Sequence, residues 1–146
     1  MRVLALDPGE KVGWARADVR EDAAWDNLEH GITSLRPMAL AIAERAENYD
    51  LFVVETFRLS ANKMRSQIGS DFPTVQFIGM VRLIAWQNGI EVRMQGPSIK
   101  DTADKTAPEW LQAIIANEPR SHDDAHNVDA LRHLWFYTWK EHVANA

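Results

Sequence analysis

The segment that most constrains the fold is a short apolar run in the middle of the chain, Leu51-Phe52-Val53-Val54, which ends at Glu55. A strand with one solvent-exposed face alternates apolar and polar residues, whereas a strand covered on both faces is apolar throughout. The run therefore predicts a central strand whose sheet has helices on both faces. Glu55 then needs a polar partner or a cation, because burying an unpaired charge is costly.

The rest of the chain supplies the other strands and helices that this arrangement requires. The predicted strands cover residues 1–6, 13–17, 30–34, 50–55 and 90–94, and the predicted helices cover residues 35–48, 74–88, 110–116 and 123–140. Thr106 and Glu109 have the spacing of a capping box before the third helix. A hairpin followed by βα units predicts an α/β fold, a mixed five-stranded sheet with helices on both faces.

Length and composition exclude several classes of protein. We expect one domain, residues 1–146, because 46% of the 146 residues are hydrophobic. No apolar stretch reaches the roughly 20 residues of a membrane span, and residues 1–6 lack the cleavage site of a signal peptide, so we expect a cytoplasmic protein. The net charge of −5 argues against coating nucleic acid by bulk electrostatics. Without cysteine, any metal must bind to oxygen or imidazole.

Two carboxylates lie at the ends of the predicted first and fourth strands, Asp7 and Glu55. If these strands are parallel neighbours, both carboxylates lie at the sheet edge where open α/β folds bind ligands. Their mutual repulsion is most simply explained by a divalent cation between them. The alternative for Asp7 is turn formation, since Asp before Pro-Gly favours a turn by itself.

The last predicted helix carries His126 and Asp129 three residues apart, with His133 one turn further along the same face. This face is able to supply an imidazole and a carboxylate to a metal held by the sheet. The alternative is structural: Asp123 and Asp124 near a helix N-terminus favour the helix dipole, and a helical histidine is often only half-buried.

Taken together, these residues resemble the RuvC-type Holliday junction resolvases of the RNase H-like nuclease superfamily, particularly their small phage members. The resemblance is carried by four blocks that span most of the chain: Leu6-Asp7-Pro8-Gly9 with Gly13-Trp14-Ala15, Val53-Val54-Glu55, residues 96–105, and His126-Asn127-Val128-Asp129. It implies an RNase H-like fold and a metal-dependent endonuclease that acts as a homodimer on branched DNA such as four-way junctions.

The resemblance also implies the catalytic and metal-binding residues. Asp7, Glu55 and Asp129 match the metal-binding carboxylates, with Asp7 bridging two Mg²⁺ ions, or Mn²⁺, roughly 4 Å apart. The fourth family position, three residues before the last Asp, is occupied by His126, as a metal ligand or as an acid or base toward water or the leaving group. Asp124 is the reserve candidate.

Basic residues in two regions match the positions where family members contact DNA. Lys100 and Lys105 lie in the third block, although the Gly-rich stretch expected between them is absent. The segment after Glu55 carries Arg58, Lys63 and Arg65, which are suited to phosphates. Its Phe57 and Met64 are suited to wedging between unstacked bases, and the alternative is a solvated loop with a hydrophobic anchor.

The predicted helix at residues 74–88 has apolar residues on more than one side. Phe77, Ile84 and Trp86 do not fit one narrow stripe, so one side is expected to pack on the sheet and another on a second subunit.

Three other functions are compatible with parts of the sequence. A sugar kinase or actin-like ATPase also begins with a strand, Asp and Gly, but this chain has no room for the second domain and extra phosphate loops. An RNase H-like nuclease acting on RNA or an RNA–DNA hybrid is barely separated from a junction resolvase by sequence. A non-catalytic DNA-binding module of the same fold would gain nothing from acidic residues clustered against phosphates.

Replacing Arg58, Lys63 and Arg65 together with Ala is expected to weaken junction binding more than it affects folding. Junction affinity and thermal unfolding of the triple variant measure the two effects. Unchanged affinity would contradict the assignment.

Overall fold

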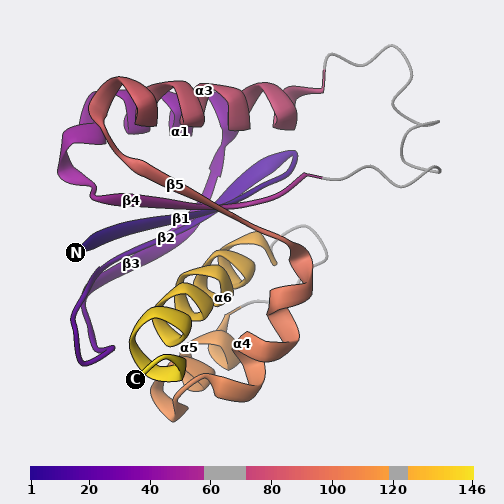
Figure 1. The fold of residues 1–146 in the computed structure, drawn as a ribbon. Helices are drawn as coiled ribbons and strands as arrows, with labels where there is room; N and C mark the ends of the chain where they lie inside the picture. Colours follow the sequence, from indigo (N-terminus) through magenta and orange to yellow (C-terminus); the bar gives the residue numbers. More distant parts are fainter. Residues whose placement is uncertain (58–71, 119–124) are drawn as a thin grey trace.

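The computed structural model describes residues 1–57, 72–118 and 125–146 and contains a five-stranded sheet in the order β3-β2-β1-β4-β5. Figure 1 shows helices on both sides of this sheet, and the sheet with its flanking helices confirms the predicted α/β architecture. The strands are β1 (Arg2–Pro8), β2 (Lys11–Val19), β3 (Trp25–Ser34), β4 (Leu51–Glu55) and β5 (Glu91–Gln95). The α-helices are α1 (Leu35–Arg45), α3 (Pro73–Asn88), α4 (Lys100–Thr106), α5 (Glu109–Asn117) and α6 (His126–Trp139).

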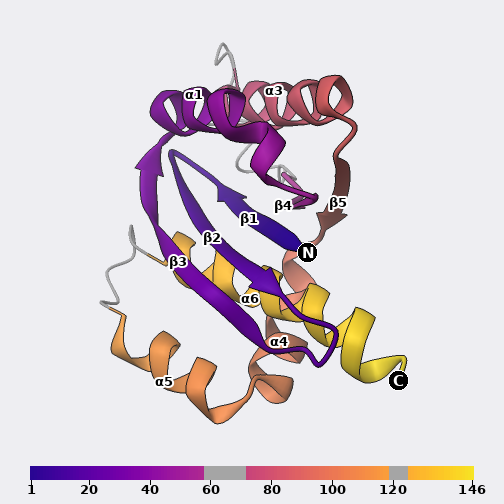
Figure 2. The same ribbon diagram turned by 90° about the vertical axis from the view of Figure 1, so that its left-hand side faces the viewer.

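The sheet combines an antiparallel half with a parallel half. The first three strands form a meander in which β1 pairs antiparallel with β2, and β2 pairs antiparallel with β3. The chain then crosses over through α1 so that β4 lies parallel to β1, and α3 carries it on to β5, which is parallel to β4. Figure 2 shows the three antiparallel strands beside one another, with β4 and β5 beyond them.

The two faces of the sheet have separate cores. On β1, Leu4 and Leu6 face the core beneath α1 and α3, whereas Val3 and Ala5 face the core beneath α4, α5 and α6. This alternation follows from the two-residue period of a strand. Asp7 is the next residue in the series that begins with Val3 and Ala5, so its side chain lies on the face that α6 covers.

Several element boundaries differ from those predicted. Strand β1 extends through Asp7 and Pro8, which pair with Gly13 and Val12, so Asp7 belongs to the strand and the turn begins later. Helix α4 was not predicted. The capping box was wrong: Thr106 ends α4 and donates its hydroxyl to the carbonyl of Thr102, and Pro108 precedes α5.

The last helix begins at His126 in the described part of the chain and continues beyond Trp139 as a π-helical turn, Lys140–Ala144. The predicted start at Asp123 lies outside the described residues. Helix α3 ends as predicted at Gly89, which adopts the left-handed conformation at a φ of 66°.

No helix within the described residues is both long and apolar enough to cross a membrane.

Gly13 determines how closely the first turn of α6 approaches the sheet. A Cβ atom at this position would lie 2.0 Å from the carbonyl carbon and oxygen of His126 and 2.5 Å from the nitrogen of Asn127. The obstacle is backbone, which cannot rotate away as a flexible side chain can. Since Gly13 pairs with Asp7 in the β1–β2 ladder, this contact holds the start of α6 directly beside Asp7.

We therefore expect Gly13→Ala to destabilise the protein by about 1–3 kcal/mol, the usual cost of overpacking a core, because the start of α6 must move. Urea unfolding measures the change. Gly96→Ala is the matched control, because its Cβ would lie 3.8 Å from the nearest side-chain atom and its φ is −75°. Equal stability of the two variants would contradict the expectation.

Candidate metal centre

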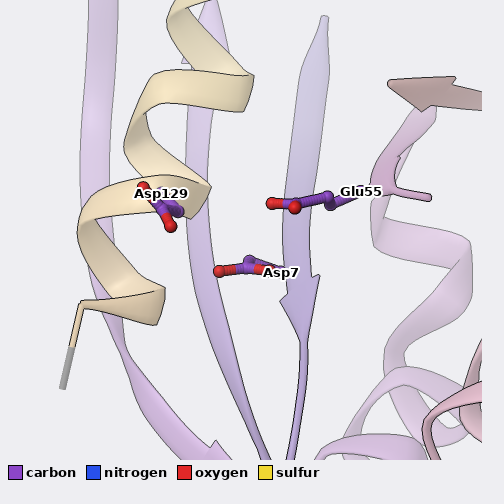
Figure 3. Close-up of side chains that lie close together, drawn as sticks. All are labelled: Asp7, Glu55 and Asp129. Carbon is purple, nitrogen blue, oxygen red and sulfur yellow. The ribbon is translucent and has the colours of Figure 1, made fainter. Parts of the chain in front are cut away.

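Three carboxylates meet at one edge of the sheet, from three elements that are far apart in sequence. Asp7 lies near the end of β1, Glu55 ends β4, and Asp129 lies in the first turn of α6. The parallel pairing of Leu6 with Val54 carries Asp7 and Glu55 to the same edge. One oxygen from each of the three carboxylates lies within 4.8 Å of the others, and Figure 3 shows the three side chains converging.

Asp7 is the most buried of the three, with 5% of its surface exposed. Burial raises the pKa of its carboxyl above the ordinary value, and repulsion from Glu55 adds to this, although the hydrogen bond to His126 opposes it. His126 Nδ1 lies 2.8 Å from Asp7 Oδ2, and this contact raises the pKa of the imidazole. The absence of a side chain at Gly9 leaves room for the ring, because a Cβ there would lie 2.8 Å from His126 Cε1.

A lysine bridges the other two carboxylates. Lys100 Nζ lies 2.7 Å from Asp129 Oδ2 and 3.2 Å from Glu55 Oε2. Burial lowers the pKa of this ammonium group, but the two carboxylates more than offset that effect and raise it overall. Arg132 Nη1 binds the second oxygen of Asp129 at 2.9 Å.

Glu55 is held ionised by its neighbours. Burial by itself would raise the pKa of this carboxyl, but the hydrogen bond with His133 and the charge of Lys100 lower it to about 2. The contact joins His133 Nε2 to Glu55 Oε2 at 2.8 Å. On its other side, His133 Nδ1 lies 2.8 Å from Oε1 of Gln95.

The donor set fits a divalent cation. Hard cations such as Mg²⁺ and Mn²⁺ prefer carboxylate oxygens, and a few carboxylates with water and a substrate phosphate complete octahedral coordination. Here three carboxylates converge with little of their surface exposed. The positive side chains of Lys100 and Arg132 offset the repulsion between them. Lys100 Nζ lies between Glu55 and Asp129, as a cation would, so the cluster already attracts positive charge.

The structure brings together five of the residues selected from sequence. Asp7, Glu55, His126, Asp129 and Lys100 share one cluster. Lys105 does not join them: it is exposed in the last turn of α4 and forms no hydrogen bond or ion pair with any described residue. The remaining selected residues lie outside the described part of the chain, namely Arg58, Lys63, Arg65 and Asp124.

Three polar residues of the site were given no role from sequence, although His133 was placed on the helical face of His126 and Asp129. Arg132 joins Asp129 to Asp104, while His133 and Gln95 form a hydrogen-bonded pair beside Glu55. The sequence positions of two of these residues indicated that they lie near the carboxylates. His133 follows Asp129 by one helical turn, and Gln95 ends the strand next to that of Glu55.

Comparison at the level of sequence finds no matching family model and no matching curated protein. Solved structures are similar over nearly the whole chain. RuvC of Thermus thermophilus has a TM-score of 0.62 at 18% identity, covering 96% of this chain and 95% of RuvC. A structure of that protein in complex with a Holliday junction substrate has a TM-score of 0.61 at 21% identity, covering 96% and 94%.

A viral resolvase and a mitochondrial resolvase are also similar. The fowlpox virus resolvase, in complex with Holliday junction DNA, has a TM-score of 0.57 at 14% identity, covering 93% of this chain and 99% of its own. The yeast mitochondrial Holliday junction resolvase has a TM-score of 0.58 at 11% identity, covering 99% and 82%. The chain therefore has the RNase H-like fold of the RuvC-type Holliday junction resolvases, as its sequence motifs implied.

Proposed function

We propose that this protein is a metal-dependent endonuclease that resolves four-way or other branched DNA junctions by hydrolysing phosphodiester bonds. The observation that carries the proposal is the convergence of Asp7, Glu55 and Asp129 at the sheet edge of a fold shared with junction resolvases. A cluster of carboxylates facing phosphates is unfavourable unless cations bind between them. Two relatives of this fold were solved with Holliday junction DNA, which favours branched DNA as the substrate.

Asp7, Glu55 and Asp129 would hold two Mg²⁺ or Mn²⁺ ions. When bound, such ions supply an activated water and stabilise the leaving oxygen of an in-line displacement. His126 completes the site in one of two roles. It adds an imidazole ligand, or it moves a proton at the attacking water or the leaving oxygen, for which its raised pKa is suitable.

Basic residues supply the contacts with DNA in this proposal. Lys100 is next to the carboxylates and would contact the phosphate near the scissile bond once a divalent ion takes over its charge-neutralising role. Lys105 lies further along the same helix and would bind the flanking backbone. Arg58, Lys63 and Arg65 follow Glu55 directly in sequence and would extend this basic surface.

Asp7→Asn is expected to abolish metal-dependent cleavage, because removing one of the three metal-binding charges loses several kcal/mol of transition-state stabilisation, roughly 1,000-fold in rate. The assay compares a labelled four-way junction, a linear duplex and an RNA–DNA hybrid, with Mg²⁺, Mn²⁺ or EDTA. Glu44→Gln is the matched control, since this exposed carboxylate lies on α1 across the sheet.

Paired cuts in the junction that need metal and Asp7 would support the proposal. Cleavage of the hybrid alone would assign the same site to RNA removal instead. Binding of the junction without cleavage in every metal would leave a non-catalytic recognition module and contradict the enzymatic proposal.

A homodimer is part of the proposal, because resolution requires cuts in two strands of a symmetric junction. The outer side of α3 supports it. Large apolar side chains are exposed there, with Leu83 at 51% and Trp86 at 67%. Val75 and Met80 on the same helix, and Leu40 on α1, are exposed as well. Apolar surface concentrated in this way is typical of an interface.

The double variant Leu83→Glu/Trp86→Glu is expected to be monomeric at micromolar concentration, because it places two charges in the proposed interface. Light scattering coupled to gel filtration measures the mass. Ala113→Glu adds a charge at an exposed position of α5, on the opposite face of the sheet, and should leave a dimer unchanged. A wild-type monomer would contradict this part of the proposal.

A further inference from the structure

A fully buried histidine connects the candidate metal centre to the neighbouring strand. His133 has no exposed surface, yet both of its ring nitrogens have side-chain partners. Nε2 lies 2.8 Å from Oε2 of Glu55, and Nδ1 lies 2.8 Å from Oε1 of Gln95. An imidazole with two polar contacts in a dry interior is held in one orientation, because breaking either contact leaves a buried polar atom unpaired.

The backbone arrangement makes this contact possible. Glu55 and Gln95 are register partners on the adjacent parallel strands β4 and β5. Both side chains point to the face of the sheet that α6 covers. His133 lies one turn beyond Asp129 on that helix and therefore reaches the gap between the two strands.

The chemistry of the three groups determines the direction of the hydrogen bonds. A carboxylate such as that of Glu55 only accepts hydrogen bonds, so the 2.8 Å contact places a proton on His133 Nε2. The Gln95 amide contains both a donor and an acceptor and is able to pair with Nδ1 in either state of the ring. Oε2 thus accepts from the histidine and also lies 3.2 Å from Lys100 Nζ. Oε1 lies 3.5 Å from the same ammonium group and is the oxygen that a divalent cation would bind.

We infer that His133, supported by Gln95, is a positioning residue that fixes the Glu55 carboxylate for metal binding. This inference rests on the proposed metal site and adds the group that orients one of its ligands. The two ring nitrogens of His133 contact Gln95 and Glu55, so the histidine is not itself one of the proposed metal ligands. It acts through Glu55, since a ligand held by a buried hydrogen bond pays less entropy when the ion binds.

The test measures Mn²⁺ affinity by electron paramagnetic resonance in the full-length protein without DNA. His133→Met, which fills the space but cannot donate, is expected to bind Mn²⁺ about 10–100-fold more weakly than wild type. His133→Gln carries an amide donor near the former Nε2 position and should recover most of that loss. Thr138→Val is the control: this fully buried residue of α6 binds Trp25 and Leu134, far along the helix from the carboxylates.

A merely structural role predicts a different pattern. In that case His133→Met and Thr138→Val would both lower the melting temperature, and neither would change Mn²⁺ affinity; that result would overturn the inference. The metal dependence of cleavage gives a second comparison. His133→Met should need about 10–100-fold more Mn²⁺ for half-maximal rate, with the rate at saturating metal close to that of wild type.

If His133→Met does not fold, nitrogen NMR of the wild-type histidine rings decides the question. We expect a proton on His133 Nε2 and a shift of its resonances when Mg²⁺ is added. An Nε2 without a proton, or resonances unmoved by saturating Mg²⁺, would overturn the inference. A wild-type protein that binds Mn²⁺ but cuts no junction would contradict the proposed function and leave this inference standing, whereas a protein that binds no Mn²⁺ would overturn both.

Discussion

The parallel pairing of β1 with β4 is the constraint on which the site depends. It carries Asp7 and Glu55 to the same edge of the sheet, and α6 then adds Asp129. Three carboxylates at this separation repel one another strongly in a partly dry environment. The fold offsets the repulsion with Lys100 and with positive or hydrogen-bonding groups on α6, so that the acidic cluster is compatible with a stable core.

Periodicity predicted the sheet and the longer helices because each of them buries a continuous apolar row. It failed where few side chains are buried. Helix α4 buries only Ala103, and its polar sequence gives no amphipathic signal. Thr106 matched a capping box by spacing alone, but its hydroxyl is used inside α4. The first strand was predicted to end at Leu6 because Asp, Pro and Gly favour a turn, whereas pairing with β2 extends the strand through Pro8.

The same reasoning explains which site residues were predictable. Asp7 and Glu55 are charged residues at the ends of apolar strands, and His126 and Asp129 share a helical face, so local sequence was sufficient to select them. Two of their partners, Gln95 and Lys100, depend on tertiary distances that no local pattern encodes. Gln95 is an ordinary polar residue until β5 lies beside β4, and Lys100 meets Asp129 only when α4 packs against α6. Arg132, by contrast, lies three residues beyond Asp129 on the same helix.

The contact between Gly13 and the first turn of α6 has a consequence for how the site tolerates change. Two backbones touch there, so no choice of rotamer adjusts the separation between the helix and the sheet. Substitutions elsewhere in the core alter that separation only if they move an entire strand or helix. The distance between Asp7 and Asp129 therefore depends little on which side chains fill most of the core. The chain shares 11–21% identity with its structural neighbours, and a spacing set by backbone in this way does not require the same side chains to fill the core.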